Sequence, residues 1–203
     1  MRPFVIDIDP ATEDTVGFAE NVTASAGAAF TLAETTAGDS LAHKVVITPS
    51  GSVTGNYTIT GTDSDGRTQT EVLATDTTNA VTSVGYYLTL VSVLAPSGLG
   101  GEVIDIGWAD EVASKTIPLD WVEPSAAYVG VDVTGTINFT LQETPTNVWE
   151  DTTPAWFALS ALTSKTADTA AIATIGVVAI RVVLNSYSAG AELQAYITQP
   201  VHQ

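Results

Sequence analysis

Residues 136–142 read TINFTLQ, in which apolar and polar side chains alternate strictly. Ile137, Phe139 and Leu141 fall on one side of an extended chain, and the polar residues fall on the other. Residues 56–60, which read NYTIT, alternate in the same way. This pattern predicts strands with one buried and one solvated face, as in antiparallel sheets.

Residues that favour turns interrupt the chain at short intervals. They cluster at residues 49–52, 65–66, 96–98, 100–101 and 188–190. Short strands broken this often predict a β-sandwich, a jelly roll or a small barrel. The Ala-rich segment 163–174 is the one place where the sequence suggests a helix.

The length and composition indicate a chain with a buried core. It has 203 residues, of which 45% are hydrophobic and 14% charged, which suits two domains of roughly 100 residues each. We expect an all-β fold in which two antiparallel β-sandwich or jelly-roll-like domains follow an extended N-terminal arm. The arm covers residues 1–22, the first β domain residues 23–110, and the second residues 111–203.

The charge balance narrows the possible partners. The net charge is −17, from six Lys or Arg against 23 Asp or Glu. So few cations cannot neutralise a run of phosphates, so we expect no nucleic-acid partner and no binding to an anionic membrane. An acidic surface keeps copies soluble, or it docks onto a basic protein surface.

Two further absences in the sequence bound the class of protein. Cysteine is absent, which excludes disulfides and thiolate metal sites. No apolar run reaches the ~20 residues that a membrane-spanning helix needs. The first ten residues lack the apolar stretch of a secretory signal, so we expect synthesis in the cytoplasm.

The residues GDSL at 38–41 match the nucleophile block of the GDSL esterases. That chemistry needs a serine at the end of a buried strand, with a histidine base and an aspartate later in the chain. Here a polar stretch precedes Ser40, His43 follows only three positions later, and the late Asp-x-x-His of that family is absent. The sequence therefore predicts no enzyme and no catalytic residue.

The residues DSDG at 63–66 suggest either a calcium loop or a hairpin. A calcium loop of the EF-hand type would need an acidic ligand at its twelfth position, where this chain has Ala74. The hairpin accounts for the residues better, because Asp-Gly favours a turn between strands 56–62 and 67–74.

Tryptophans beside acids raise the possibility of carbohydrate binding. Acidic residues lie close in sequence to Trp108, Trp149 and Trp156, a combination that some sugar-binding sites use. The alternative is that each tryptophan seals the end of a sandwich. His43 and His202 are far apart and lack further ligands, so we expect no metal and no cofactor.

Two stretches resemble the virion proteins of tailed bacteriophages. The first comprises GNYTITGTDSDGRTQTE at 55–71, the strand at 81–93, which begins VTSV, and GEVIDIG at 101–107. The second comprises IPLDW at 117–121, residues 131–142, TPAWF at 153–157 and AIRV at 179–182, and it is similar to a companion β domain of the same kind of protein. Together the two stretches span most of residues 55–200.

This resemblance implies a structural part of a virion that is assembled in the host cytoplasm. The first expectation is a decoration or cement protein that coats or stabilises the capsid. The alternatives are a neck, collar or tail component, or a module that binds carbohydrate on the host surface. The partners it implies are the major capsid protein or neck and tail proteins. Cyclic assembly suits such proteins, so we expect a homo-oligomer, with a trimer as one candidate.

Two parts of the chain are candidate interfaces. The strand-like start of the arm could add to the sheet edge of a neighbouring subunit, with a disordered terminus as the alternative. Its candidate residues are Phe4, Val5, Ile6 and Ile8. Arg181 interrupts the apolar strand 175–184, where it either pairs with an acid across a contact between domains or subunits, or lies solvated at an edge.

Overall fold

The computed structural model describes residues 4–120, 126–151 and 154–199. The chain forms two compact units: residues 1–10 together with 113–203, and residues 11–112 between them. We call the first the split unit and the second the inserted unit. The observed boundary after residue 112 differs by two positions from the expected boundary after residue 110.

The split unit holds eight of the described strands and one short 3-10 helix. They are β1 (Phe4–Ile8), β9 (Ile117–Pro118), β10 (Tyr128–Thr134), β11 (Ile137–Thr144), β12 (Phe157–Ala158), η1 (Ser160–Leu162), β13 (Thr169–Ile172), β14 (Ala179–Tyr187) and β15 (Glu192–Thr198). The inserted unit holds β2 (Asp14–Val22), β3 (Ala42–Pro49), β4 (Asn56–Thr62), β5 (Thr68–Ala74), β6 (Val81–Tyr87), β7 (Thr89–Leu94) and nearly all of β8 (Ile104–Ala113). The described chain is therefore all-β, as the alternation predicted.

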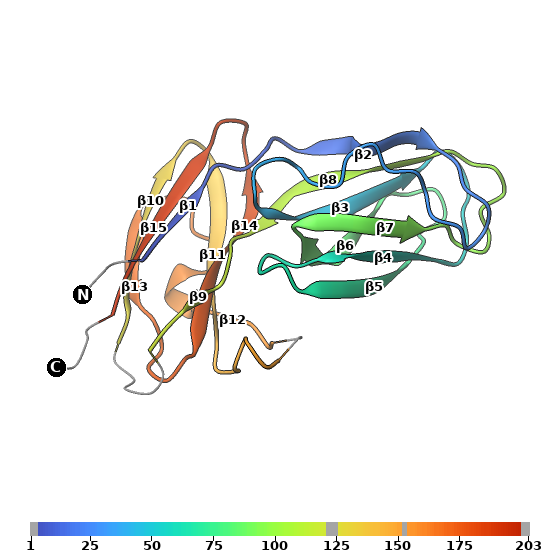
Figure 1. Ribbon diagram of the computed structural model, residues 1–203. Coiled ribbons are helices and arrows are strands. Elements are labelled where there is room, and N and C mark those ends of the chain that lie inside the picture. Colours follow the sequence, from blue (N-terminus) through green and yellow to red (C-terminus); the bar gives the residue numbers. More distant parts are fainter. Residues whose placement is uncertain (1–3, 121–125, 152–153, 200–203) are drawn as a thin grey trace. The chain divides into compact units, whose positions relative to one another are not determined.

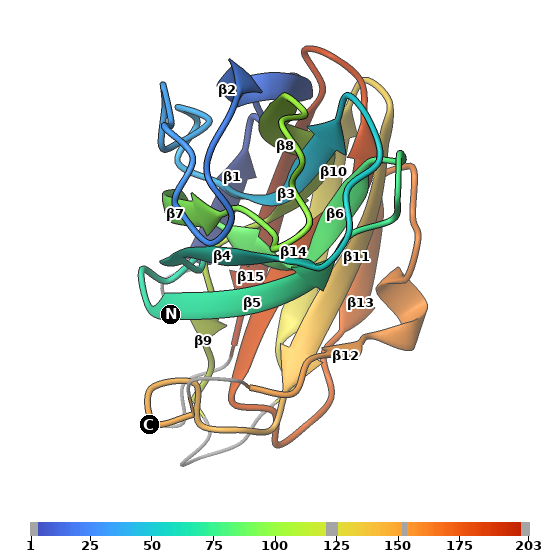
Figure 2. The same ribbon diagram turned by 90° about the vertical axis from the view of Figure 1, so that its right-hand side faces the viewer.

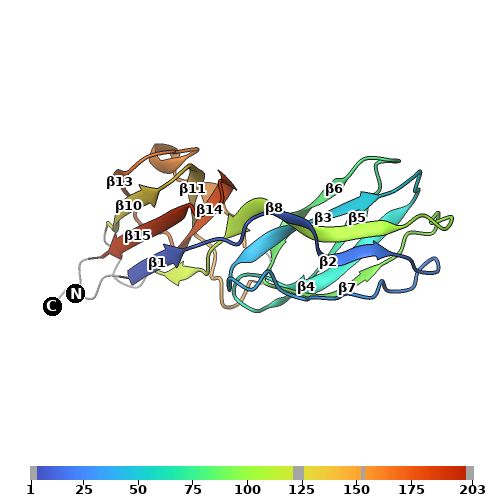
Figure 3. The same ribbon diagram turned by 90° about the horizontal axis from the view of Figure 1, so that it is seen from above.

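One sheet of the split unit joins the two ends of the chain. Its strand order is β1–β15–β10–β13, with all neighbours antiparallel. Figure 3 shows β1, in blue, beside β15, in red. In this register Ile6 faces Ala195 and Ile8 faces Leu193, and alternate residues of β1 enter the core. The expectation of an extended arm over residues 1–22 is therefore wrong, because β1 pairs with β15 and β2 pairs with β8.

The other sheet of the split unit contains β12, β11 and β14, and β9 pairs with β14. Phe139 and Leu141 of β11 and Val182 and Leu184 of β14 are buried, as the alternation predicted. The expectation of a solvated opposite face is wrong for part of it, because Thr140 and Val183 are 6% and 2% exposed. The helix suggested for residues 163–174 is absent. Part of that segment is β13 instead, because pairing with β10 outweighs the helical preference of alanine.

The inserted unit has two sheets around one core. One sheet has the order β8–β3–β6 with β2 on β8, and the other has the order β5–β4–β7. Figure 1 shows β2 to β8 in colours from blue to yellow-green. Ile47 and Ile106 from the first sheet and Ile59 and Leu90 from the second belong to one buried cluster. Burial of such side chains contributes about 2 kcal/mol each.

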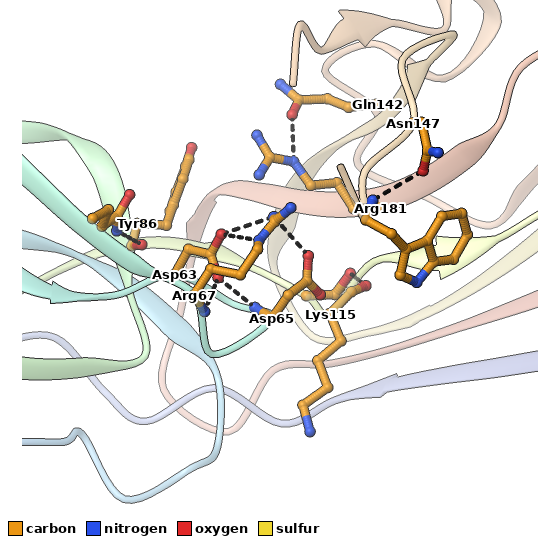
Figure 4. A network of polar contacts seen from close by, with 11 residues as sticks. Asp63, Asp65, Arg67, Tyr86, Lys115, Gln142, Asn147 and Arg181 are labelled. Carbon is orange, nitrogen blue, oxygen red and sulfur yellow. Dashed lines mark hydrogen bonds and ion pairs between the residues drawn. The ribbon is translucent and has the colours of Figure 1, made fainter. Parts of the chain in front are cut away.

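The hairpin predicted at residues 63–66 is confirmed. It joins β4 to β5, which run side by side in Figure 2. Asp63 Oδ1 accepts hydrogen bonds from the backbone amides of Asp65 and Arg67, both at 2.9 Å. Arg67 donates to Asp63 Oδ2 at 2.8 Å and to Asp65 Oδ2 at 3.0 Å, as Figure 4 shows. Gly66 has a φ of +80°, which a residue without a side chain adopts at little cost.

Side chains of β5 bind the backbone edge of β6, which belongs to the other sheet. Glu71 accepts hydrogen bonds from the amides of Val84 at 2.8 Å and Gly85 at 2.9 Å, and Gln69 donates to the carbonyl oxygen of Tyr86. Three backbone groups at the edge of β6 are thereby satisfied. A sheet edge that is bonded in this way is less open to pairing with another chain.

A buried Asp–His pair forms hydrogen bonds at the start of β3. His43 is 1% exposed, and its Nε2 lies 2.7 Å from Asp39 Oδ2. Asp39 also accepts hydrogen bonds from the amides of Ala11 at 2.7 Å and Leu41 at 3.0 Å. Burial raises the pKa of the Asp39 carboxyl, but the hydrogen bonds and the charge of His43 outweigh burial and hold that pKa below 3.8.

The Asp39 network predicts a pH dependence of stability. A carboxyl whose pKa is lowered by folding stabilises the fold above its unfolded pKa, and it loses that effect as the pH falls through the lowered value. Asp39→Asn should lower the free energy of unfolding by about 2 kcal/mol at pH 6, and this difference from the unmodified protein should shrink below pH 3.8. Urea unfolding over a range of pH measures it. A difference that does not change with pH would contradict the assignment.

Candidate interaction surface

β1 lies at an edge of its sheet. Within the part of the chain that the structure describes, β1 pairs with β15 on one side and with no strand on the other. Phe4 shares the inward parity of Ile6 and Ile8, but it is 47% exposed whereas they are 6% and 0% exposed. Phe4 is therefore an apolar side chain on the core side of the sheet that lacks the cover a further strand would give it.

The outward side of this sheet carries exposed apolar side chains. Val5 lies beside Tyr196, and Tyr128 lies beside Ile172, in the register of the strands. All four are between 41% and 63% exposed. Gly130 faces Tyr196, and a Cβ there would lie 3.6 Å from the Tyr128 ring, an ordinary contact distance.

The same side of the sheet is acidic at its other end. Asp7 lies beside Gln194, which lies beside Asp132, and Glu192 follows on β15. The Gln194 amide donates to Asp7 at 3.3 Å, and the Tyr196 hydroxyl donates to Gln194 at 2.6 Å. The sequences of the four strands contain no Lys or Arg. We call this outward side, from Val5 to Glu192, the acidic sheet face.

The four residues of β1 that the sequence predicted as an interface differ in exposure. Phe4 and Val5 are exposed, whereas Ile6 and Ile8 are buried in the core of their own unit, so neither isoleucine is placed to contact another protein. The difference follows from the pairing of β1 within its own chain, which commits one face of the strand to the core.

Arg181 lies on β14, in the other sheet of the split unit. Its Nε donates to Gln142 at 2.9 Å, as Figure 4 shows. Its guanidinium lies 4.3 Å from the centre of the Trp156 ring. Val183 and Ala179 on the same strand face are 2% and 0% exposed, so the apolar face expected beside Arg181 is covered. A role for Arg181 in binding a partner stays a prediction.

Ser40 of the GDSL stretch and the nearby His43 do not face each other. Ser40 is exposed, but the two ring nitrogens of His43 face Asp39 and, at 3.4 Å, the carbonyl oxygen of Ala109. The imidazole is thus engaged away from the serine. Among the described residues no group of three or more His, Asp or Glu side chains could hold a metal ion. His202 lies outside the described residues.

The tryptophans differ in their environments. Trp108 is 9% exposed and packs edge to face against Phe18 at 5.0 Å, as the sealing interpretation predicted. Trp149 is 61% exposed, so the same interpretation is wrong for it. Trp156 is half-buried beside Arg181.

Comparisons with known proteins add no family. Neither the models of protein families nor the curated proteins match this chain. In the described part of the chain no helix has the length and hydrophobicity that crossing a membrane requires.

Sequence reasoning missed most of the acidic sheet face. The alternation in residues 128–134 and 192–198 does contain the signal. It puts Tyr128 on the strand face away from the buried Val129 and Val131, and Tyr196 on the face away from the buried Ala195 and Ile197. It does not reveal which strands are neighbours, and only that neighbourhood brings the tyrosines beside Val5.

Paired truncations of β1 test its placement. Ile8→Ala should lower the free energy of unfolding by about 3 kcal/mol because it leaves a cavity in the core. Val5→Ala should change it by less than about 0.5 kcal/mol, since exposed positions tolerate truncation. Urea unfolding measures both. Equal small losses would mean that β1 does not pair with β15 in solution.

Proposed function

We propose that this protein is a non-enzymatic structural component of a bacteriophage virion, in the first place a decoration or cement protein on the capsid. A neck, collar or tail component is the alternative position. In this proposal the two units are β-sandwich or jelly-roll-like domains. The chain is assembled into the particle in the host cytoplasm, and its partners are other virion proteins, with self-association into a homo-oligomer.

The observation that carries the proposal is the open edge and outward side of the β1 sheet. A surface that combines an unpaired strand edge, exposed tyrosines and carboxylates offers contacts for another protein. This suits a protein that works by attachment to a partner.

The charge of the chain supports attachment to a basic protein surface. The net charge is −17, and the exposed acids of the acidic sheet face contribute to it without a compensating Lys or Arg on the same strands. Complementary charge steers two proteins together and sets their orientation. The phosphate backbone of packaged nucleic acid would be repelled by the same charge.

The resemblance of stretches within residues 55–107 and 117–182 to phage virion proteins supports a bacteriophage virion as the particle. The structure adds a reason for part of that pattern. Asp63, Asp65 and Arg67 of the ITGTDSDGR stretch form the bonded hairpin, and Glu71 binds β6. Gly107 of the GEVIDIG stretch lies where a side chain would collide with the backbone of Asp14 and Thr15. The pattern is thus one of fold-forming residues.

A second candidate function is binding of carbohydrate on a host surface. The observation that favours it is Trp149, which is 61% exposed and is followed by the exposed acid Glu150. An exposed tryptophan offers a flat apolar face on which a sugar ring can stack, and a neighbouring carboxylate can accept its hydroxyl hydrogens.

Mass spectrometry of purified particles tests the leading proposal. The protein should be present in particles that have been washed in high salt and banded by density. Copies on the order of hundreds per particle indicate a capsid decoration protein, because the capsid offers many equivalent sites. A handful to a few dozen copies indicate the neck or tail.

Absence from the particle would contradict both positions. The matched control is the host proteome in the same fractions, which measures carry-over. If the protein is absent from particles and binds a glycan array through Trp149, the carbohydrate-binding function replaces the virion function.

A further inference from the structure

The edge of β1 is open in a way that the edge of β6 is not. In the inserted unit, Glu71 accepts hydrogen bonds from two backbone amides of β6, and Gln69 donates one to a backbone carbonyl oxygen of β6. No side chain among the described residues is seen to do the same for the outer edge of β1. Phe4, 47% exposed on the core side of the strand, adds apolar surface next to that edge. An added strand would satisfy the backbone groups and cover Phe4 together.

The two sides of β1 differ in what they would require of an added strand. On the core side the neighbour of the new strand is Phe4, so alternate residues of the strand should be apolar. On the outward side its neighbours are Val5 and Asp7, with Asp132 and Glu192 further across the face and no cation on any of the four strands. Opposite charges on neighbouring strands attract, so the residues of the added strand that face outward should be Lys or Arg.

We propose that the outer edge of β1 accepts, by strand addition, an extended segment of a partner protein in which apolar and basic residues alternate. This inference rests on the proposed function for the identity of the partner as another virion protein. The recognition chemistry comes from the edge itself. Backbone hydrogen bonds provide the docking, and the alternation of apolar and basic side chains selects the register.

A second copy of this chain is the less favourable occupant. Two β1 strands that paired antiparallel about Ile6 would place Val5 of each beside Asp7 of the other and would provide no cation. Each copy also carries a net charge of −17, and like charges repel across such a contact. Charge complementarity therefore favours a basic partner.

Synthetic peptides provide the probes. The test peptide is a fluorescein-labelled seven-residue segment in which Val and Lys alternate, capped at both ends. The first control has the same composition with the Val and Lys residues in separate blocks, and the second replaces every Lys by Glu. Fluorescence anisotropy with the full-length protein in low salt gives the three dissociation constants.

The alternating basic peptide should bind at least about tenfold more tightly than the blocked peptide, because only alternation fits both sides of the strand. The Glu peptide should not bind. The affinity of the alternating peptide should weaken as salt rises from about 50 to 500 mM, since part of the attraction is electrostatic.

Two variants of equal charge change locate the contact. Asp7→Lys reverses the charge beside the edge and should weaken binding about tenfold. Glu20→Lys changes the net charge by the same amount at an exposed position of β2 in the inserted unit, and it should leave the affinity nearly unchanged. Phe4→Ser should weaken binding without weakening the fold, because Phe4 is exposed.

Equal binding of the alternating and blocked peptides would overturn strand addition, and so would equal weakening by Asp7→Lys and Glu20→Lys. No binding of any peptide would overturn it too. These results are separate from those of the particle analysis. If the protein is found in virions but does not bind the alternating peptide, the proposed function stands and this mode of docking is wrong. A protein absent from virions that binds the peptide through β1 retains the docking chemistry and loses the virion partner.

Discussion

The pairing of β1 with β15 is the constraint on which the split unit depends. It brings strands from opposite ends of the chain into one sheet, places Ile6 and Ile8 in the core, and makes residues 11–112 an insertion between them. Such a long-range contact must overcome the entropy of closing the whole intervening loop. The same pairing turns Val5 and Asp7 outward beside Tyr196 and Gln194, so the candidate interaction surface exists only because the strand is paired.

The backbone edges of β6 and β1 differ in whether side chains of the described residues bind them. The inserted unit binds the edge of β6 with Glu71 and Gln69 and closes its β4–β5 hairpin with Asp63 and Arg67. Bonded edges resist unwanted pairing with other chains. In the split unit, β1 keeps one edge without such bonds among the described residues, next to a half-exposed Phe4. An edge left open beside a single-sign surface suits selective recognition of a partner.

Local features of the fold followed from the sequence, and long-range ones did not. Alternation found the strands around Ile59 and Phe139, and Asp65-Gly66 found the hairpin, because each depends on neighbouring residues. The expected arm was wrong because nothing local in residues 4–8 shows that β15 is their partner. The helix expected near residue 170 was wrong for the same reason, since β10 determines its conformation. Of the candidate site, Phe4 and Val5 were found, but Tyr128 and Tyr196 needed the strand order.

Amide hydrogen exchange of the free protein along β1 tests the central claim most directly. An edge strand in an antiparallel sheet directs alternate amides to its neighbour and the intervening amides to solvent. In residues 4–8 we expect slowly and rapidly exchanging amides to alternate, with the slow ones matched by protected partners on β15. Uniformly fast exchange would show that β1 is a free arm, and uniformly slow exchange would show that its outer edge is already covered. Either result would contradict the account.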